Sequence, residues 1–398
     1  MAKRIYLCLA HMSEAGNEQK YIQEAFDTNW VTLLGPNVNG FEADLESFVS
    51  EGKRVVALSS GTAAMHLALM ACGVGPGDEV CVQSFTFCAS SHPVLYLGAT
   101  PVFIDSERDT WNMSPELLEA AIKDRIAKTG RKPKAIVPVA LFGMPYRIDK
   151  IMEIASRYDI PVIEDAAEGF GSRFNGRMLG TFGRYGVLSF NGNKIITTSG
   201  GGALITAGDD QWREIMLYST QYHEKYPFYE HEKVGFNYRM SNICAGIGRG
   251  QMTVAEAHIA HHRHVQRLYE QLFEGVRGIT VHKQPAGGLF DSNYWLCTIT
   301  VDPELKIKGQ ESVFRPDVDC RPNDNVEALR VFMDAAGIEA RPVWKPMHKQ
   351  PVYKDAPAYV NGVSESVFKV GLCLPAGPCV SDQDVKYIVD TVKDAIVG

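Results

Sequence analysis

Three short groups of polar residues stand where buried strands are expected to end. The first is Ser59-Ser60-Gly61-Thr62-Ala63, between a strand-like run at 54–59 and a helix-like run at 62–72. A helix N-terminus leaves backbone N–H groups free and carries a partial positive charge, so it can bind a phosphate. Gly61 would let the backbone approach that ligand, and Ser60 or Thr62 could add a hydroxyl. The same residues would also make an ordinary helix cap.

The second group is acidic and the third contains a lysine. Glu164, Asp165 and Glu168 follow the apolar run 161–163, and Lys194 follows the run 186–190, just before a glycine-rich turn. Ligands of open α/β sheets bind beyond the carboxyl ends of strands. A lone acid there would more often cap the next helix, and a lone lysine is usually a solvated surface group. A desolvated lysine, however, can lose its proton and form a Schiff base.

The combination is more informative than any one group. In chain order it supplies an anion site, an acid and an amine. Pyridoxal 5′-phosphate needs this set for its phosphate, its pyridinium nitrogen and its aldehyde. The sequence therefore predicts a pyridoxal phosphate site.

Two other clusters have simpler interpretations. Gly73, Gly75 and Gly77 follow a helix-like run and precede a strand-like one, which is the reverse of a dinucleotide-binding turn, so they are expected to end the helix. A set of histidines falls on one expected helix, and three of them share a face: His258, His261, His262 and His264. A metal site is conceivable there, but no cysteine or acid set completes it, so we predict none.

The elements that must position these groups alternate along the chain. Strands are expected at 54–59, 79–82, 101–105, 134–141, 161–165, 186–190 and 202–206, and helices at 62–72, 90–97, 115–123 and 147–158. Apolar runs without polar alternation suit strands buried on both faces. Such alternation of strands and helices predicts an α/β fold with a mostly parallel sheet.

A smaller α+β domain is expected after this sheet. The regular alternation of strands and helices ends near residue 210. Helices are then expected at 211–222, 241–272, 325–336 and 381–397, with a strand at 294–301 and a loop at 306–325. We place the large domain, with an N-terminal arm, at 1–250 and the small C-terminal domain at 251–398.

Composition limits the possible partners. The 398 residues include 40 Lys and Arg against 47 Asp and Glu, a net charge of −7, which argues against binding nucleic acid as a polymer. The nine cysteines, from Cys8 to Cys379, form no CxxC pair or dense framework, and Cys88 is expected to be a small packed residue. No run is long enough for a membrane span or a signal peptide. We expect a soluble cytoplasmic protein.

Motifs through most of the chain add a family resemblance. The sequence resembles the sugar aminotransferases of the DegT/DnrJ/EryC1/StrS family, which are fold type I pyridoxal phosphate enzymes with a large, seven-stranded-type, mostly parallel sheet. The matching segments are Trp30-Val31-Thr32 with Leu34-Gly35-Pro36, SSGTAA at 59–64, PGDEV at 76–80, SFTFCAS at 84–90, GATPVFID at 98–105, EDAAEGFGS at 164–172, LSFNGNK at 188–194, GGG at 200–202, GFNYRMSN at 235–242 and RPVWKPMHKQP at 341–351.

The resemblance implies a role for individual residues. Lys194 would form the Schiff base and shuttle protons, and Asp165 would pair with the pyridinium nitrogen. Glu168 would lie near the O3′ side of the ring, although the family often has His or Gln there, and Phe87 would stack on the ring. The phosphate would be held by Gly61, Thr62, Ala63 and Ser189, with Asn237 reaching it from the partner subunit. Substrate-side candidates are Trp30, Thr32, His231, Tyr238, Arg239, Trp344, Lys345 and His348.

The implied reaction is the transfer of an amino group from L-glutamate to C4 of a nucleotide-linked 4-keto-6-deoxyhexose, in the biosynthesis of a glycan such as lipopolysaccharide. Lys345, Arg239 and Arg341 could meet the diphosphate, and UDP is the favoured nucleotide. A GDP-linked substrate, as in perosamine formation, and amination at C3 are alternatives. A branch of the family that removes a hydroxyl has histidine in place of the lysine, so Lys194 favours transamination. A cofactor-binding regulator is a more distant alternative, and a homodimer with shared active sites is expected.

Overall fold

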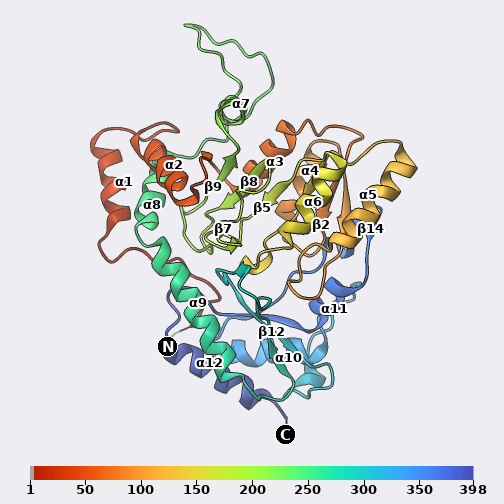
Figure 1. Ribbon diagram of the computed structural model, residues 1–398. Helices are drawn as coiled ribbons and strands as arrows, with labels where there is room; N and C mark the ends of the chain where they lie inside the picture. The colour runs from red at the N-terminus through yellow and green to blue at the C-terminus, as the bar shows by residue number, and fades with distance from the viewer. Residues whose placement is uncertain (1–3, 398) are drawn as a thin grey trace.

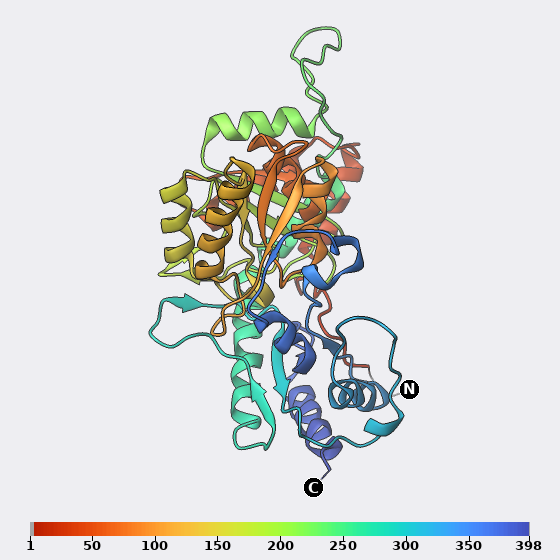
Figure 2. The ribbon, with the colours of Figure 1, turned by 90° about the vertical axis from the view of Figure 1, so that its right-hand side faces the viewer.

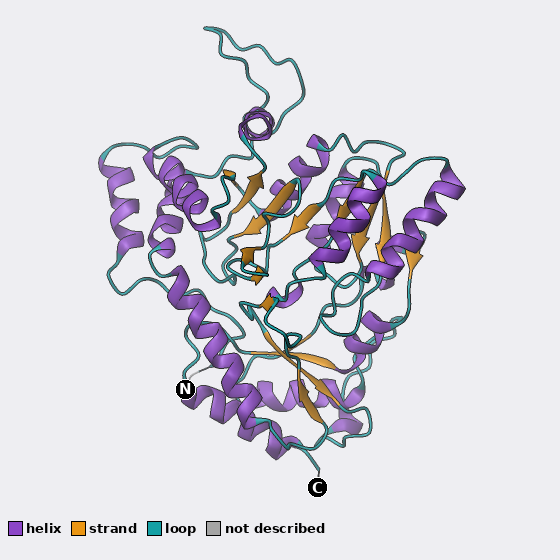
Figure 3. Cartoon of the chain, in the orientation of Figure 1, coloured by secondary structure: helices purple, strands orange, loops and turns teal. Residues whose placement is uncertain are grey.

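The computed structural model describes residues 4–397. A large mixed sheet with helices around it forms one end of the molecule and a smaller sheet with three long helices forms the other (Figures 1 and 3). Helix α9 (Ala255–Leu272) runs from the first toward the second, and the N-terminal segment lies beside the smaller sheet, where Ile5 bridges Ile338.

The large sheet confirms the expected fold class. Its two hydrogen-bonded blocks have the strand orders β1-β9-β8-β5 and β4-β2-β3-β14, and parallel bridges from Ile136 to Val162 and from Val139 to Asp165 join them. Strand β9 runs antiparallel to both neighbours, whereas the other neighbours are parallel. The strands are β1 (Arg54–Leu58), β2 (Glu79–Gln83), β3 (Thr100–Ile104), β4 (Ala135–Val137), β5 (Ile163–Asp165), β8 (Tyr185–Ser189), β9 (Gly202–Thr206) and β14 (Ala358–Tyr359).

Helices cover this sheet on both faces (Figure 2). Helix α3 (Gly61–Ala71) is apolar on nearly all sides because it packs between the sheet and helix α7. The others around the sheet are α1 (Asn17–Asp27), α2 (Pro36–Val49), α4 (His92–Tyr96), α5 (Pro115–Thr129), α6 (Ile148–Tyr158), α7 (Asp209–Ser219) and α8 (Asn242–Met252).

The smaller sheet is antiparallel, in the order β10-β12-β15-β13. Its strands are β10 (Ile279–Val281), β12 (Cys297–Val301), β13 (Arg341–Pro342) and β15 (Gly371–Leu374), and its helices α10 (Asp324–Ala335), α11 (Val363–Val370) and α12 (Asp382–Ala395). Residues from α9, β12, α10, β15 and α12 form its core. Strand β14 nevertheless lies in the large sheet, so the C-terminal part of the chain contributes to both sheets.

The single helix predicted at 241–272 is wrong. The chain leaves the helix at Thr253 and Val254, and separate helices α8 and α9 result. A Cβ on Gly248 would lie 2.7 Å from the ring of Phe41, and one on Gly250 would lie 2.5 Å from the nitrogen of Glu18, so α8 packs tightly against the N-terminal helices. Those helices, α1 and α2, and the small sheet of β6 (Arg173–Phe174), β7 (Arg177–Met178) and β11 (Phe290–Asp291) were not predicted.

Among residues 4–397, the helices all lack the combination of length and apolar composition that crossing a membrane requires.

Candidate active site

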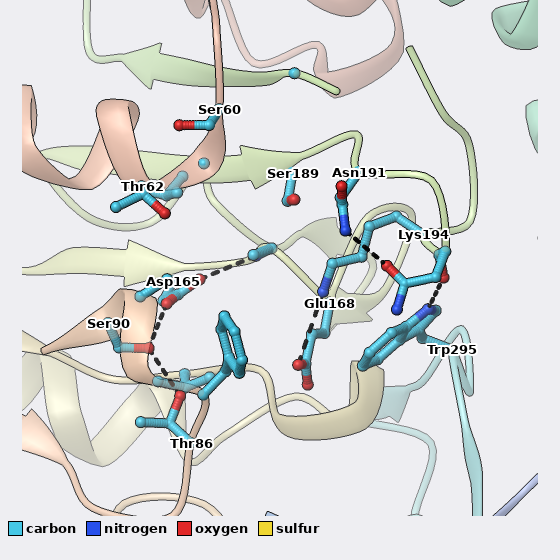
Figure 4. A pocket seen from close by; sticks show the side chains of 18 of the residues that line it. Ser60, Thr62, Thr86, Ser90, Asp165, Glu168, Ser189, Asn191, Lys194 and Trp295 are labelled. Atoms are coloured by element: carbon cyan, nitrogen blue, oxygen red, sulfur yellow. Dashed lines mark hydrogen bonds and ion pairs between the residues drawn. The ribbon is translucent and has the colours of Figure 1, made fainter. Parts of the chain in front are cut away.

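The three polar groups of the sequence open into one cavity of about 290 Å³, beyond the carboxyl ends of β5 and β8 (Figure 4). Its position follows from the parallel strands, since their carboxyl ends meet at one edge of the sheet. Its polar and aromatic lining comprises Ser59, Ser60, Thr62, Thr86, Phe87, Ser90, Asp165, Glu168, Ser189, Asn191, Asn193, Lys194, Trp295 and Trp344.

One end of the cavity is the N-terminus of helix α3. The Ser60 hydroxyl accepts a hydrogen bond from the Ala63 N–H at 3.0 Å, and the Ser60 carbonyl accepts one from Ala64. The N–H groups of Gly61 and Thr62 have no acceptor within the helix, so they can bind an anion, which the helix dipole also favours. Ser189 lies beside this turn, because a Cβ on Gly61 would be 3.2 Å from the Ser189 Cβ.

Gly202 keeps this turn in place. A Cβ there would lie 2.3 Å from the Gly61 nitrogen. We therefore expect Gly202→Ala to displace the turn and to weaken binding of pyridoxal phosphate at least about tenfold, which corresponds to about 1.4 kcal/mol. Titration of the cofactor followed by absorbance measures the change. Gly75→Ala is the control, because its Cβ meets nothing within 4 Å; equal cofactor affinities in the two variants would contradict the prediction.

The acid in the middle of the cavity is Asp165, the last residue of β5. Ser90 donates a hydrogen bond from its hydroxyl to Asp165 Oδ2 at 2.6 Å, the Ala167 N–H donates to Oδ1 at 3.2 Å, and Thr86 contacts Ser90 at 2.7 Å. Burial raises the pKa of Asp165, and the hydrogen bonds from Ser90 and Ala167 act in the opposite direction. The carboxyl group is thus fixed in orientation and open to a cationic partner.

Removing the Ser90 hydroxyl should shift the acidic limb of the pH–activity profile to higher pH. Its hydrogen bond favours the charged carboxylate, so Ser90→Ala raises the pKa of Asp165 further. Activity that needs the carboxylate should then be lost at a higher pH on the acidic side of the profile, with a loss of about threefold to tenfold near neutrality. Measuring kcat against pH checks this. A shift of the acidic limb to lower pH would contradict it, and Ser91→Ala on the same turn is the control.

The amine at the other end is Lys194, whose side chain is 14% exposed. Its Nζ lies 3.8 Å from Glu168 Oε1 and 3.9 Å from the ring centroid of Trp295. The Trp295 indole N–H donates to the Asn193 carbonyl at 2.7 Å. Glu168 is buried, which raises its pKa, and its Oε2 accepts a hydrogen bond from the Phe142 N–H at 2.7 Å. A primary amine, a buried acid and an anion site therefore face one small space.

This donor set fits pyridoxal 5′-phosphate. The helix N-terminus offers N–H groups for a phosphate, Asp165 offers a carboxyl for a protonated ring nitrogen, and Lys194 offers an amine for an aldehyde. Phe87 and Trp344, whose ring centroids are 5.3 Å apart, supply aromatic surface at the cavity wall. The absence of a side chain at Gly61 lets this turn pack closely against the end of β8, since a Cβ there would lie 3.3 Å from the Leu188 carbonyl oxygen.

The structure brings together about half of the predicted site residues. The cavity is lined by Gly61, Thr62, Phe87, Asp165, Glu168, Ser189, Lys194 and Trp344, whereas the Ala63 N–H is used within the cap. Lys345 borders an adjoining hollow that shares Thr86, Phe87 and Trp344 with the cavity. His348 does not line that hollow; its Nδ1 contacts the Ser84 hydroxyl at 2.6 Å.

The remaining predicted residues lie outside this cavity within the chain. Arg239 is buried and its guanidinium binds Glu42 Oε1 at 2.6 Å and the Ala57 carbonyl at 3.0 Å, so it ties α2 to β1. Arg341 pairs with Glu339, and Tyr238 contacts His66. A long segment between α7 and α8 projects from the molecule (Figure 1); at its base Asn237 pairs with Thr220, and His231 contacts the Gln221 carbonyl. Trp30 and Thr32 precede α2.

Sequence reasoning did not assign several lining residues. Thr86 and Ser90 belong to a quoted motif and follow β2, so their position at a strand's carboxyl end was an available signal. Asn191 and Asn193 precede Lys194 directly. Trp295 gives no local signal, because it reaches the cavity from a segment about a hundred residues away.

The histidines of α9 bind separate backbone and side-chain partners. His258 contacts the Ile195 carbonyl, His261 the Val380 carbonyl, His262 the Tyr294 carbonyl and His264 the Asp382 carboxyl. They connect α9 to three other segments, near Ile195, Tyr294 and 380–382, and no set of three potential ligands gathers among residues 4–397.

Comparisons with known proteins agree with this geometry. The model of the DegT/DnrJ/EryC1/StrS aminotransferase family matches residues 12–393. The chain is 42% identical over 396 residues to EpsN of Bacillus subtilis (strain 168), which carries the name of a pyridoxal phosphate-dependent aminotransferase, covering 98% of this chain and 96% of EpsN. It is 33% identical over 391 residues to the GDP-perosamine synthase of Escherichia coli O157:H7, covering 98% of each. A crystal structure of a family member from Brucella abortus matches with a TM-score of 0.84 at 30% identity, over 96% of this chain and 95% of the other.

Proposed function

Because this chain belongs to the DegT/DnrJ/EryC1/StrS aminotransferase family, we propose that it transfers an amino group from L-glutamate to C4 of a nucleotide-linked 4-keto-6-deoxyhexose. It is a sugar aminotransferase, and pyridoxal phosphate is the cofactor that the family and the donor set support. The observation that carries the proposal is the convergence of Lys194, Asp165 and the α3 N-terminus on one cavity.

Each of these groups has a defined task. When bound, pyridoxal phosphate supplies an electron sink for the pair of electrons left on carbon after proton removal. The N–H groups of Gly61 and Thr62 bind and orient the phosphate, and Asp165 holds a proton on the ring nitrogen by charge. Lys194 Nζ takes the proton from the α-carbon of the amino donor and later returns a proton to the amino acceptor. Trp295 and Trp344 line this space with aromatic surface, which would limit the access of water to the reacting atoms.

The substrate class is supported by the relatives and by the cavity's surroundings. EpsN and a GDP-perosamine synthase are similar over nearly the whole chain, and the latter name specifies a nucleotide-linked amino sugar. The adjoining hollow is mostly apolar, with Phe87, Trp344, Met347 and Lys345 on its wall, which suits a sugar ring next to a diphosphate. Lys345 could contribute a charge there, although its Nζ now donates to the Asp319 carbonyl at 2.6 Å.

UDP is the nucleotide expected from the sequence, and GDP is the alternative that the perosamine synthase similarity favours. The decisive experiment incubates the enzyme with L-glutamate and a panel of UDP- and GDP-linked sugars that carry a keto group at C4 or at C3. Mass spectrometry and NMR of the products identify both the nucleotide and the aminated carbon. Reaction with GDP-linked sugars alone would contradict the UDP preference, and a product aminated at C3 would contradict the C4 assignment.

The functional unit proposed here is a homodimer, located in the cytoplasm. The segment between α7 and α8 projects from the molecule with its aromatic side chains Tyr226, Phe228 and Tyr229 exposed, and Asn237 pairs with Thr220 at its base. A second copy could cover these side chains and receive the segment near its own cavity. Light scattering of the purified protein tests the dimer, and a monomer with full activity would contradict shared active sites.

A further inference from the structure

The surroundings of Lys194 contain a feature that neither phosphate binding nor pairing with the ring nitrogen explains. The Lys194 Nζ contacts a carboxylate and the face of an aromatic ring at nearly equal distances, 3.8 Å to Glu168 Oε1 and 3.9 Å to the Trp295 ring centroid (Figure 4). Both groups stabilise a cation rather than a neutral amine.

We propose that Glu168 and Trp295 form a site that holds the Lys194 ammonium while the lysine carries a proton and is not bonded to the cofactor. The proposal rests on the proposed function, in which Lys194 alternates between a bonded and a free state. In the free state the amine takes a proton from carbon, so that a C–H bond breaks and an N–H bond forms. The resulting positive charge then faces the Glu168 carboxylate and the Trp295 ring. Glu168 and Trp295 are therefore positioning residues, because they affect the reaction through Lys194.

Glu168 is oriented for this role by the backbone. Its Oε2 accepts the hydrogen bond from Phe142, which leaves Oε1 directed toward Lys194. Phe142 has φ 53°, a left-handed conformation that is costly for a residue with a side chain. The Glu168 main chain is also fixed, since its carbonyl accepts a hydrogen bond from the Asn293 side chain at 2.9 Å. The position of Oε1 is therefore set before the ammonium forms.

Trp295 is oriented by the residue next to Lys194. Its side chain is 98% buried, and its indole N–H donates to the Asn193 carbonyl at 2.7 Å. This hydrogen bond ties the ring to the chain segment that carries Lys194. Since Trp295 comes from the segment preceding β12, this contact also links the lysine to the smaller sheet.

Other ionisable groups around Lys194 are compatible with this pair. Asp165 interacts electrostatically with Lys194, and its carboxyl group accepts a hydrogen bond from the Ser90 hydroxyl. Cys8 also faces Lys194 and Trp295, but burial raises its pKa to about 12, so it is a neutral thiol at physiological pH. Cys373 is buried, which raises its pKa, and the Glu168 charge acts in the same direction. Glu168 is consequently the nearest group that can supply a negative charge to the lysine.

The test measures the lysine without turnover. The enzyme is loaded with pyridoxamine 5′-phosphate, which has no aldehyde to bond with Lys194, and is treated with trace acetic anhydride at several pH values. This reagent acylates an unprotonated amine, and peptide mass spectrometry gives the labelling rate of Lys194. Lys123, exposed on α5, is the internal reference. Glu168→Gln keeps the size and the acceptor for Phe142 but removes the charge.

We expect Lys194 in Glu168→Gln to be labelled about tenfold faster than in the unmodified enzyme near neutral pH, with the labelling curve moved to lower pH. Trp295→Leu should give about a threefold increase, and Lys123 should be unaffected. If the labelling rate of Lys194 is unchanged in Glu168→Gln, the proposal is overturned. If it is unchanged in Trp295→Leu, the indole is not part of the ammonium site. Circular dichroism establishes that each variant is folded.

The outcome is independent of the substrate assignment. Faster labelling together with no amination of any ketosugar would support the ammonium site and contradict the proposed function. Amination of a ketosugar together with unchanged labelling in both variants would support the function and overturn the ammonium site.

Discussion

Lys194→Ala is expected to abolish amino transfer, with kcat lower by at least about 10⁴-fold. The substitution removes both the amine that bonds the cofactor and the group that moves the proton. The phosphate site at Gly61 and Thr62 and the carboxyl of Asp165 are untouched, so cofactor should still bind without a covalent bond. Product formation by mass spectrometry gives the rate, and borohydride reduction followed by peptide mapping shows whether cofactor is attached to the protein.

The control for this variant is Lys123→Ala, which removes an exposed lysine from α5 and should leave the rate unchanged. The cofactor-free variant should unfold at a lower temperature, because it leaves the buried Glu168 carboxylate without the Lys194 ammonium 3.8 Å away and loses the contact with Trp295. Amination of ketosugar by Lys194→Ala at a tenth of the normal rate or faster would be incompatible with the assignment.

Asp165→Asn is expected to lower kcat by about 10²–10³-fold. An amide has nearly the same shape; its oxygen can accept from the Ala167 N–H while its NH2 group donates to the Ser90 hydroxyl oxygen, but it has no charge to keep a ring nitrogen protonated. The loss should therefore appear in kcat more than in KM for the sugar. Steady-state kinetics, together with the absorbance of bound cofactor, measure the effect.

The thermal stability of Asp165→Asn, unlike its kcat, should stay the same or increase. Burial raises the pKa of Asp165 above its ordinary value, so the ionised carboxylate costs stability at pH values above that ordinary value. Asp165→Asn removes this cost, and the cofactor-free protein should unfold at an equal or higher temperature at pH 7. Asp210→Asn, at an exposed acid, is the control for both measurements. A clear loss of thermal stability with unchanged kcat would identify Asp165 as a structural residue instead.

The strands and their order of appearance could be read from the sequence because their signal is local. Runs such as 54–59 and 202–206 are apolar and β-branched, and the observed strands β1 and β9 coincide with them within one residue. Strand β14 carries no such pattern, since it has two residues and exists through pairing with β3. The helix break at Thr253 is likewise set by packing of α8 against α1 and α2, which is not a local property.

By itself the sequence predicted the candidate reacting groups: a turn at Ser60 and Gly61 that could bind phosphate, a group of acids around Asp165, and the amine of Lys194, each at or after the end of an expected strand. Such groups converge because parallel strands end at a common edge. Only the tertiary structure decided that Trp295 and the Phe142 N–H would surround Lys194 and Glu168, and that Arg239 would be bound by Glu42. These contacts join residues far apart in the chain, so they depend on how the elements pack and leave no pattern in the local sequence.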